Sequence, residues 1–388
     1  MLLNRINQRL AKLALKDLLR QQKIISNKST KDNIITVNGR PCIDFTSNDY
    51  LGLKFHKKIL ESVTQGAKCY GNGSGSSTMI SGYTDLQHTF EVDYAKWLGV
   101  EKAILFNSGY LANLGSITAL SDHNCTILLD KLCHSSILDG VILSRAKYYR
   151  YRHCESKHLE HLANLYKPEL MITESVFSME GDIAPLAKFL KVATKYQALT
   201  IIDDAHGIGI LGESGHGVLG LGRTVKPYAT CVVMPLGKAF CGLGAIVAGK
   251  ESIINIISQR ANTYRYTTAL PPGIVSGLKS ALELVIDESW RRDKLHKNIK
   301  FFNSVAEEKK IILVSSFDAP IRTILVADIK KLLKIQNILI EKGFYVSAIR
   351  PPTVPEKKSR IRISVNALHS DHEIYLLLSH IATILHEK

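Results

Sequence analysis

Lys238 stands in a setting that favours chemistry over simple solvation. It follows the apolar run Cys231–Met234 and has small and apolar neighbours from Pro235 to Phe240. Removing water from an amine lowers its pKa, and the neutral amine can then attack a carbonyl carbon to form a Schiff base. A surface lysine in a turn is the simpler interpretation if this segment is taken alone.

Polar residues follow other apolar runs in the same way. Asp203 ends the run Leu199–Asp203, and His206 comes three residues later. A carboxylate at the end of a buried strand costs desolvation energy unless it has a partner, so capping or ion pairing is the plain alternative. The turn at Gly109 comes between an apolar run and a helical pattern, where backbone N–H groups favour a phosphate.

The order of these signals is more specific than any one of them. A phosphate-binding turn, an acid at a strand end and a desolvated lysine follow one another along the chain. Pyridoxal phosphate (PLP) requires this combination, since a lysine holds its aldehyde and an acidic partner keeps its pyridine nitrogen protonated. The sequence therefore predicts a PLP enzyme in which Lys238 and Asp203 have these roles.

Alternating strands and helices between residues 46 and 275 would position these groups. Runs that are apolar throughout, joined by helices such as Leu186–Tyr196, predict an α/β fold with a mostly parallel sheet between helices. Ligands of such sheets bind beyond the carboxyl ends of the strands. The predicted strands are Ala103–Phe106, Thr126–Leu129, Leu170–Glu174, Leu199–Asp203, Cys231–Met234 and Ala245–Ala248.

Two further regions flank this large PLP-binding domain of residues 46–275. Residues 1–45 predict a helical arm and a hairpin, in which Lys31–Thr36 and Pro41–Phe45 flank the turn Asn38-Gly39. Residues 276–388 predict a smaller C-terminal α/β domain, entered by a long helix after Pro271-Pro272. Its expected elements are strands at Ile321–Val326, Phe344–Val346 and Arg360–Val365, a helix at Ile329–Lys342 and a final helix.

Composition narrows the class of protein. The chain has 388 residues, seven scattered cysteines without a CxxC pair, and a formal charge of +15. The cysteine pattern is typical of a reducing cytoplasm, and no apolar run reaches the roughly 20 residues that span a bilayer. The basic residues are dispersed, without a nucleic-acid motif. We expect neither nucleic acid nor membrane as partner, while a polyanionic substrate or an acidic carrier protein would suit the charge.

At these positions the sequence resembles the α-oxoamine synthases, PLP enzymes of fold type I that condense an amino acid with an acyl thioester. The segment Arg350 to Pro355 looks most like enzymes of this family that join L-alanine to a pimeloyl thioester on the way to biotin. The thioester would be carried by coenzyme A or by a carrier protein. The resemblance covers nearly the whole chain, in the segments Ser47 to Leu53, Gly71 to Gly75, Ser81 to Tyr83, Asn107 to Asn113, Asp130 to Ser135, Thr173 to Asp182, Asp203 to Gly207, Gly237-Lys238 and Arg350 to Pro355.

The resemblance implies a role in cofactor chemistry for five side chains. Lys238 would carry the cofactor, Asp203 would pair with its ring nitrogen, and His134 would stack on the ring face. Ser178 and His206 would contact the ring hydroxyl. In the implied reaction alanine displaces Lys238, which then removes the α-proton. The carbanion attacks the thioester, and the β-keto acid loses CO2.

The phosphate would be held from two chains. The Gly109 and Tyr110 backbone would bind it within one subunit, and Thr267 and Thr268 would reach the cofactor phosphate of a neighbouring subunit. The resemblance therefore implies a homodimer. No metal is expected.

Substrate contacts are implied at both ends of the chain. Asn48 and Arg362 would bind the carboxylate of the amino acid, with Asn48 part of the catalytic set. Arg20 and Thr353 would line the acyl-substrate site, where Arg350 is a candidate for a terminal carboxylate or the carrier's phosphates.

Two departures from the family pattern adjoin the lysine. Pro235 stands where the family has Thr or Ser bonding the phosphate, and Cys241 and Leu243 stand where it prefers Gly and Ser. The alternatives with related chemistry are glycine acetyltransferase, 5-aminolevulinate synthase and serine palmitoyltransferase. An aminotransferase and a non-catalytic protein of this fold are the alternatives from other classes.

Overall fold

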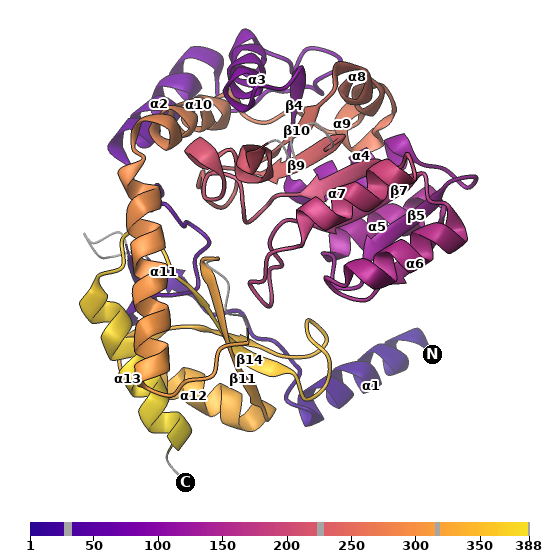
Figure 1. The fold of residues 1–388 in the computed structure, drawn as a ribbon. Coiled ribbons are helices and arrows are strands. Elements are labelled where there is room, and N and C mark those ends of the chain that lie inside the picture. Colours follow the sequence, from indigo (N-terminus) through magenta and orange to yellow (C-terminus); the bar gives the residue numbers. More distant parts are fainter. Residues whose placement is uncertain (27–32, 223–228, 315–318, 387–388) are drawn as a thin grey trace. The chain divides into compact units, whose positions relative to one another are not determined.

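A computed structural model describes residues 1–26, 33–222, 229–314 and 319–386 (Figure 1). The described chain forms two compact units. One unit comprises Met1–Tyr50, Met179–Asp182 and Asp293–Lys388, and the other comprises Leu51–Ser178 and Ile183–Arg292. The predicted division into residues 1–45, 46–275 and 276–388 stays a prediction, and each unit is described by itself below.

The second unit is built on a seven-stranded sheet with the order β4-β10-β9-β8-β7-β5-β6. The strands from β9 to β6 pair in parallel, and only β10 runs opposite to its neighbours β4 and β9. The mostly parallel sheet is therefore confirmed. Its strands are β4 (Lys102–Phe106), β5 (Thr126–Asp130), β6 (Lys147–Tyr151), β7 (Leu170–Glu174), β8 (Leu199–Asp203), β9 (Cys231–Pro235) and β10 (Ala245–Gly249).

Helices connect these strands and complete the core. Side chains such as Ile117, Ile137 and Ile254 from the helices share one buried cluster with strand residues Ile172 and Val233. Burial on both faces explains why the central strands are apolar throughout. The helices are α2 (Lys57–Tyr70), α3 (Asp85–Leu98), α4 (Gly109–Leu120), α5 (Ser135–Ser144), α6 (Ser156–Tyr166), α7 (Leu186–Lys195), α8 (Glu251–Arg260), α9 (Asn262–Arg265) and α10 (Pro272–Asp287), with short 3₁₀ turns η1 (Glu213–Gly215) and η2 (Gly217–Gly220).

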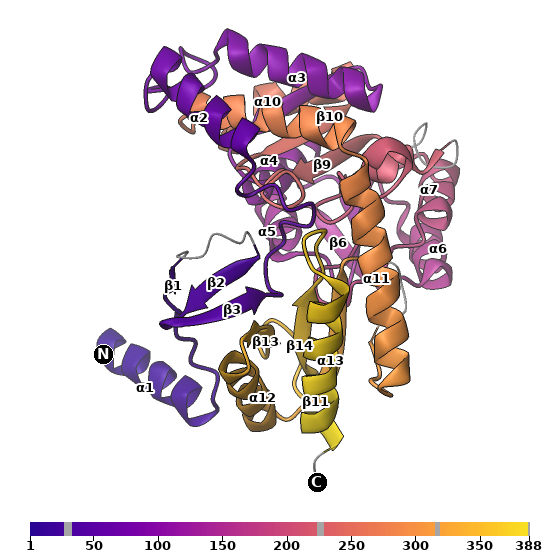
Figure 2. The same cartoon turned by 90° about the vertical axis from the view of Figure 1, so that its left-hand side faces the viewer.

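The first unit contains two smaller sheets, ordered β1-β2-β3-β12 and β11-β14-β13 (Figure 2). Helix α12 contacts β12 and α13, so the C-terminal part of the chain packs against the N-terminal hairpin strands. The elements are α1 (Leu2–Leu15), β1 (Ile25–Ser26), β2 (Ile34–Val37), β3 (Arg40–Asp44), α11 (Trp290–Glu308), β11 (Ile321–Ala327), α12 (Ile329–Glu341), β12 (Phe344–Tyr345), β13 (Ser347–Ile349), β14 (Ser359–Ser364) and α13 (Asp371–His386).

The predicted hairpin turn is confirmed at Asn38-Gly39. Both residues have positive φ, 47° and 86°, as a two-residue turn of the primed type requires. Strands β2 and β3 flank it in antiparallel register. Residues 31 and 32 of the predicted first strand lie outside the described residues.

Three further features concern membrane-spanning helices, disulfides and the helix after Pro271. No helix in the described ranges is long and apolar enough to cross a membrane. All seven cysteines lie within the described ranges, and none of them forms a disulfide there. The long helix after Pro271 is confirmed as α10.

Candidate active site

The loops at one edge of the seven-stranded sheet enclose a cavity of about 170 Å³. All strands except β10 point their carboxyl ends to this edge, so segments that are distant in sequence meet there. The cavity combines amine, imidazole, amide and carboxylate groups in one small space. It is lined by Gly109, Tyr110, Asn113, His134, Ser136, Glu174, Ser178, Asp203, Ala205, His206, Pro235 and Lys238.

Lys238 lies in the tight connection between β9 and β10. The N–H of Leu236 donates to the Gly244 carbonyl at 2.9 Å, and that of Cys241 donates to the Lys238 carbonyl at 2.8 Å. Cys241 has φ of 48°, a left-handed conformation for which glycine is the favoured residue. These bonds fix the backbone of Lys238 at the cavity wall.

Asp203 is a buried carboxylate held by neutral donors. Its exposed fraction is 4%, and its Oδ2 accepts a hydrogen bond from Asn113 Nδ2 at 2.6 Å. Its Oδ1 accepts from the N–H of Ala205 at 2.9 Å. The same Asn113 Nδ2 lies 3.0 Å from Ser136 Oγ. Asn113 on helix α4 and Ser136 on helix α5 therefore help to orient Asp203 toward the cavity.

The adjacent acid, Asp204, lies elsewhere. It does not line the cavity, and its Oδ2 accepts the N–H of Val218 at 2.9 Å. A Cβ at Gly207 or Gly217 would overlap its carboxylate, so both positions require glycine. Complete burial raises the pKa of Asp204 to about 7, against the opposing effect of its hydrogen bonds.

His134 caps α5 and faces the same cavity. Its backbone N–H donates to Glu174 Oε1 at 2.6 Å, and its Nδ1 lies 2.8 Å from Ser136 Oγ. Burial lowers the pKa of His134, with Lys238 acting in the same direction and Asp203 opposing it. Burial and the charge of Asp203 raise the pKa of Glu174 well above its usual range. The surroundings therefore favour neutral imidazole and protonated Glu174.

A helix N-terminus forms the remaining wall. Helix α4 begins at Gly109, directly after Ser108, whose Oγ accepts the N–H of Leu111 at 3.3 Å. The first N–H groups of a helix have no partner within it and carry partial positive charge, which favours an anion. A Cβ at Gly109 would overlap the ring of Pro235, so these two residues are in close contact.

Thr267 and Thr268 do not line this cavity. The Thr268 carbonyl accepts a hydrogen bond from Asn107 Nδ2 at 2.6 Å, and Thr268 forms an isolated bridge with Ser77. The backbone of Thr268 is thus attached to the loop before Gly109, while Thr268 itself is exposed.

The first unit holds a second cavity, of about 440 Å³, which includes Arg20, Arg350 and Thr353. Arg20 Nη2 donates to Thr353 Oγ1 at 2.5 Å and to the Arg350 carbonyl at 3.3 Å. Lys23 also lines this cavity, and burial lowers its pKa. None of the described residues that line the cavity is acidic, so it presents three cations to a ligand.

Asn48 and Arg362 meet in the same unit but do not line that cavity. Arg362 Nη2 donates to Asn48 Oδ1 at 3.2 Å, and Arg362 Nη1 donates to Ser364 Oγ at 3.1 Å. The Tyr50 hydroxyl donates to the same Asn48 oxygen at 3.1 Å. The predicted carboxylate-binding pair is therefore a hydrogen-bonded pair in the structure.

Some residues that line the two cavities have no role predicted from the sequence. Asn113 follows Gly109 by one helical turn, so helical spacing placed it on the cavity side of α4. Glu174 ends β7 as Asp203 ends β8, and the two pair across the sheet. Both signals were available in the sequence. Lys23 had no comparable signal, because its cavity combines segments from both ends of the chain.

Known proteins share this chain's sequence and fold. The family model described as aminotransferase class I and II matches residues 40–381. The 8-amino-7-oxononanoate synthase of Methylococcus capsulatus is 40% identical over 96% of this chain and 96% of its own length. That of Saccharophagus degradans is 40% identical over 89% and 87%.

Solved structures agree with these relatives. The 8-amino-7-oxononanoate synthase of Francisella tularensis is 34% identical and superposes with a TM-score of 0.78 over 89% of this chain and 98% of its own. Serine palmitoyltransferase of Sphingomonas wittichii is 27% identical, with a TM-score of 0.91 over 98% and 96%. The chain therefore belongs to the aminotransferase class I and II family, among the 8-amino-7-oxononanoate synthases.

Proposed function

We propose that the protein catalyses the PLP-dependent, decarboxylative condensation of L-alanine with a pimeloyl thioester. The products are 8-amino-7-oxononanoate, CO2 and the free thiol, and the reaction is a step toward biotin. The observation that carries this proposal is the convergence of Lys238, Asp203 and His134 on one cavity in a chain of this family.

The residues of the cavity fit PLP. Lys238 supplies the amine for its aldehyde, Asp203 a carboxylate for its ring nitrogen, and the start of α4 at Gly109 a site for its phosphate. Asn113 Oδ1 is buried and has no hydrogen-bond partner among the described residues, which leaves an acceptor beside the site. Ser178 and His206 line the same cavity and would contact the ring hydroxyl.

Bound PLP supplies an electron sink for a carbanion at the α-carbon of alanine. The ε-amine of Lys238 would hold the cofactor and, when free, would take the α-proton of alanine and return a proton later. Asp203 would keep a proton on the ring nitrogen, because its carboxylate is buried at the cavity wall, where little water screens its charge. A neutral His134 suits a role against the face of the cofactor ring.

The substrates would be held by the first unit. Asn48 and Arg362 provide an amide and a guanidinium for the carboxylate of alanine. The cavity of Arg20, Arg350 and Thr353 offers cations without a lining acid, which suits an acyl chain with a terminal carboxylate or the phosphates of its carrier. The assay below distinguishes coenzyme A from a carrier protein as the acyl carrier.

The proposed assembly is a homodimer. Thr267 and Thr268 do not line the cavity of their own chain, and the backbone of Thr268 is held beside the loop that leads to Gly109. These threonines would contact the cofactor phosphate of the neighbouring subunit.

A substrate panel tests the proposed function. Purified protein with PLP is given alanine, glycine or serine with pimeloyl or acetyl thioesters, each on coenzyme A or a carrier protein, and products are identified by mass. We expect alanine with a pimeloyl thioester to have the highest kcat/KM. A methyl group in a pocket is worth about 1–3 kcal/mol, so glycine should react roughly 10- to 200-fold more slowly. If glycine with an acetyl thioester is best, the protein is an acetyltransferase instead.

A further inference from the structure

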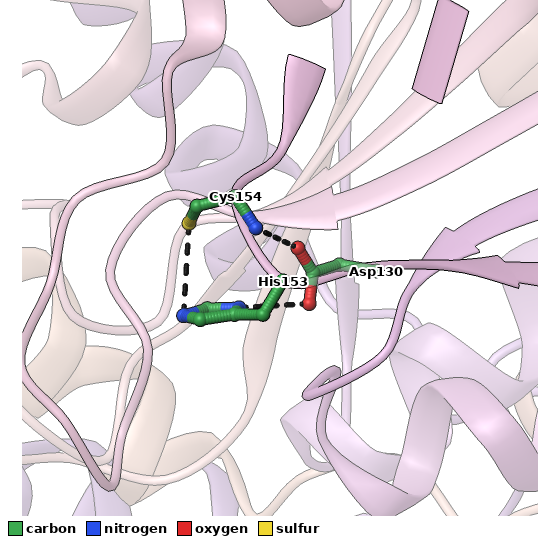
Figure 3. Close-up of side chains that lie close together, drawn as sticks. All are labelled: Asp130, His153 and Cys154. Carbon is green, nitrogen blue, oxygen red and sulfur yellow. Dashed lines mark hydrogen bonds and ion pairs between the residues drawn. The ribbon is translucent and has the colours of Figure 1, made fainter. Parts of the chain in front are cut away.

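A second group of reactive side chains lies apart from the cofactor cavity. Asp130 ends β5, and His153 and Cys154 form the turn after β6 (Figure 3). His153 Nδ1 lies 2.9 Å from Asp130 Oδ1, and Cys154 Sγ lies 3.7 Å from His153 Nε2. A carboxylate, an imidazole and a thiol therefore follow one another in contact.

Asp130 fixes this arrangement. Its side chain is almost fully buried, and its Oδ2 accepts the backbone N–H of Cys154 at 2.8 Å. Cys154 has φ of 53°, a left-handed conformation that few residues other than glycine adopt without strain. The structure thus holds the thiol against the histidine at a conformational cost.

The contacts use different ring nitrogens. The carboxylate lies at Nδ1, whereas the thiol lies at Nε2. With the Nδ1 proton donated to Asp130, Nε2 is the basic nitrogen and faces the thiol side. Each of the three side chains also offers one ligand atom within 4.8 Å of the others. The carboxylate and the thiol nevertheless contact opposite ring nitrogens, an arrangement that suits proton transfer from the thiol to the imidazole.

We propose that Cys154 is a histidine-assisted reactive thiol that is oxidised by small hydroperoxides. His153 takes the thiol proton, and the thiolate sulfur attacks the distal oxygen of the peroxide. An S–O bond forms as the O–O bond breaks, the sulfur is oxidised by two electrons to sulfenic acid, and the leaving alkoxide or hydroxide takes the proton from His153. A low-molecular-weight thiol then converts the sulfenic acid to a mixed disulfide and water.

The surroundings support a small reactant. A cavity of about 10 Å³ beside Cys154 has roughly the volume that one water-sized molecule needs. Two titratable neighbours of His153 and Cys154 are accounted for. Arg152 forms an ion pair with Glu155 at 2.9 Å, and burial raises the pKa of Tyr151, so its hydroxyl stays protonated. The imidazolium formed on proton transfer stays adjacent to Asp130, which stabilises it.

The chain offers two internal comparison thiols. Cys69 is exposed and lies 3.3 Å from Gln65 Nε2, without a histidine contact in the described structure. Burial and the neighbouring carboxylates raise the pKa of Cys133 well above its usual range. If solvent exposure alone set the reaction rate, Cys69 would be the most reactive of these thiols. Assistance by His153 would instead make Cys154 the most reactive.

Residue-resolved labelling of the full-length PLP-loaded protein tests this. Alkylation by iodoacetamide, and sulfenic acid trapping after hydrogen peroxide, are followed by mass spectrometry between about pH 6 and pH 8, a range around the ordinary imidazole pKa. We expect Cys154 to react at least about threefold faster than Cys69 near neutral pH. The expected difference is modest because a thiol that loses its proton more readily is also less nucleophilic, which offsets part of the gain in thiolate. Cys133 should remain unmodified.

A variant separates histidine assistance from mere access. His153→Gln keeps a polar side chain of similar size without a base, and should lower the Cys154 rates to or below those of Cys69. Cys154→Ser should keep the alanine condensation activity and lose the fast label. Equal rates at Cys154 and Cys69 in the unaltered protein, or an unchanged Cys154 rate in His153→Gln, would overturn the proposal.

Discussion

Asp203, the last residue of β8, and Asp204, which follows it, lie in different surroundings. Successive residues of an extended chain point to opposite sides, so Asp203 faces the cavity and Asp204 does not. Asn113 bonds Asp203, while a close fit against Gly207 and Gly217 encloses Asp204. A pKa of about 7 favours protonated Asp204 below neutral pH. Of these two aspartates, only Asp203 can contact a ligand in the cavity.

Replacing each aspartate in turn tests this difference. Asp203→Asn should weaken PLP binding and slow exchange of the alanine α-proton by at least about a hundredfold, since the ring nitrogen would lose the carboxylate that keeps it protonated and the cofactor would accept electrons less well. Asp204→Asn is the matched control, because its amide oxygen can still accept the Val218 N–H. Exchange is followed by deuterium incorporation into alanine. Near-normal exchange in Asp203→Asn, or a larger loss in Asp204→Asn, would contradict the assignment.

At this scale the sequence could place the proposed reacting groups at the cavity better than it could predict their hydrogen-bond partners. Lys238 and Asp203 follow apolar strands, which is a local signal. The bond from Asn113 to Asp203 joins residues far apart in the chain and depends on how α4 packs. Such a contact cannot be read from spacing, because it exists only once the sheet has formed.

At the scale of elements, burial decides which strands the sequence could predict. The six predicted strands of the large sheet are confirmed because they are buried on both faces and apolar throughout. Strand β6 was missed because it is an edge strand of the sheet, and its sequence, Lys147–Tyr151, is largely polar and exposed. The opposite direction of β10 also lay beyond the sequence signal, since apolar content carries no information on direction.

The junction of β9 with the turn of Lys238 leads to a second prediction. Pro235 ends β9 against Gly109, where a hydroxyl could reach the phosphate. A hydrogen bond to a charged group contributes about 1.5–3 kcal/mol, so Pro235→Thr should tighten PLP binding about tenfold or more. Pro235→Val is the control, because valine has the shape of threonine without its hydroxyl. Titration of the apoprotein with PLP measures both.

The same comparison shows how the prediction could fail. If threonine and valine give equal affinity, other groups already satisfy the phosphate. If both bind more weakly than the unaltered protein, the contact between the Pro235 ring and Gly109 is itself part of the site.

At the scale of the whole molecule, hybrid dimers test whether each site draws on two chains. Chains with Lys238→Ala are mixed with chains carrying both Thr267→Ala and Thr268→Ala, then unfolded and refolded together with PLP. One site of each hybrid would have its lysine and the threonines of the other chain, so activity should exceed the sum of the parents. Mixing Lys238→Ala with Asp203→Asn is the control and should show no recovery, since both defects lie within one chain's site. Equal results in the two mixtures would rule out the shared site.

The position of β10 has a consequence for the order of folding. It pairs with β4 on one side and β9 on the other, and β4 has no other neighbour in the described sheet. During synthesis, residues 102–106 therefore emerge long before residues 245–249, which cover their hydrogen-bonding edge. An apolar strand left open for that time invites pairing with other chains. If Lys238 carries the cofactor as proposed, its place in the connection that precedes β10 means that covalent PLP would be held only once this connection has formed. Bound PLP would then mark chains in which β10 covers the edge of β4.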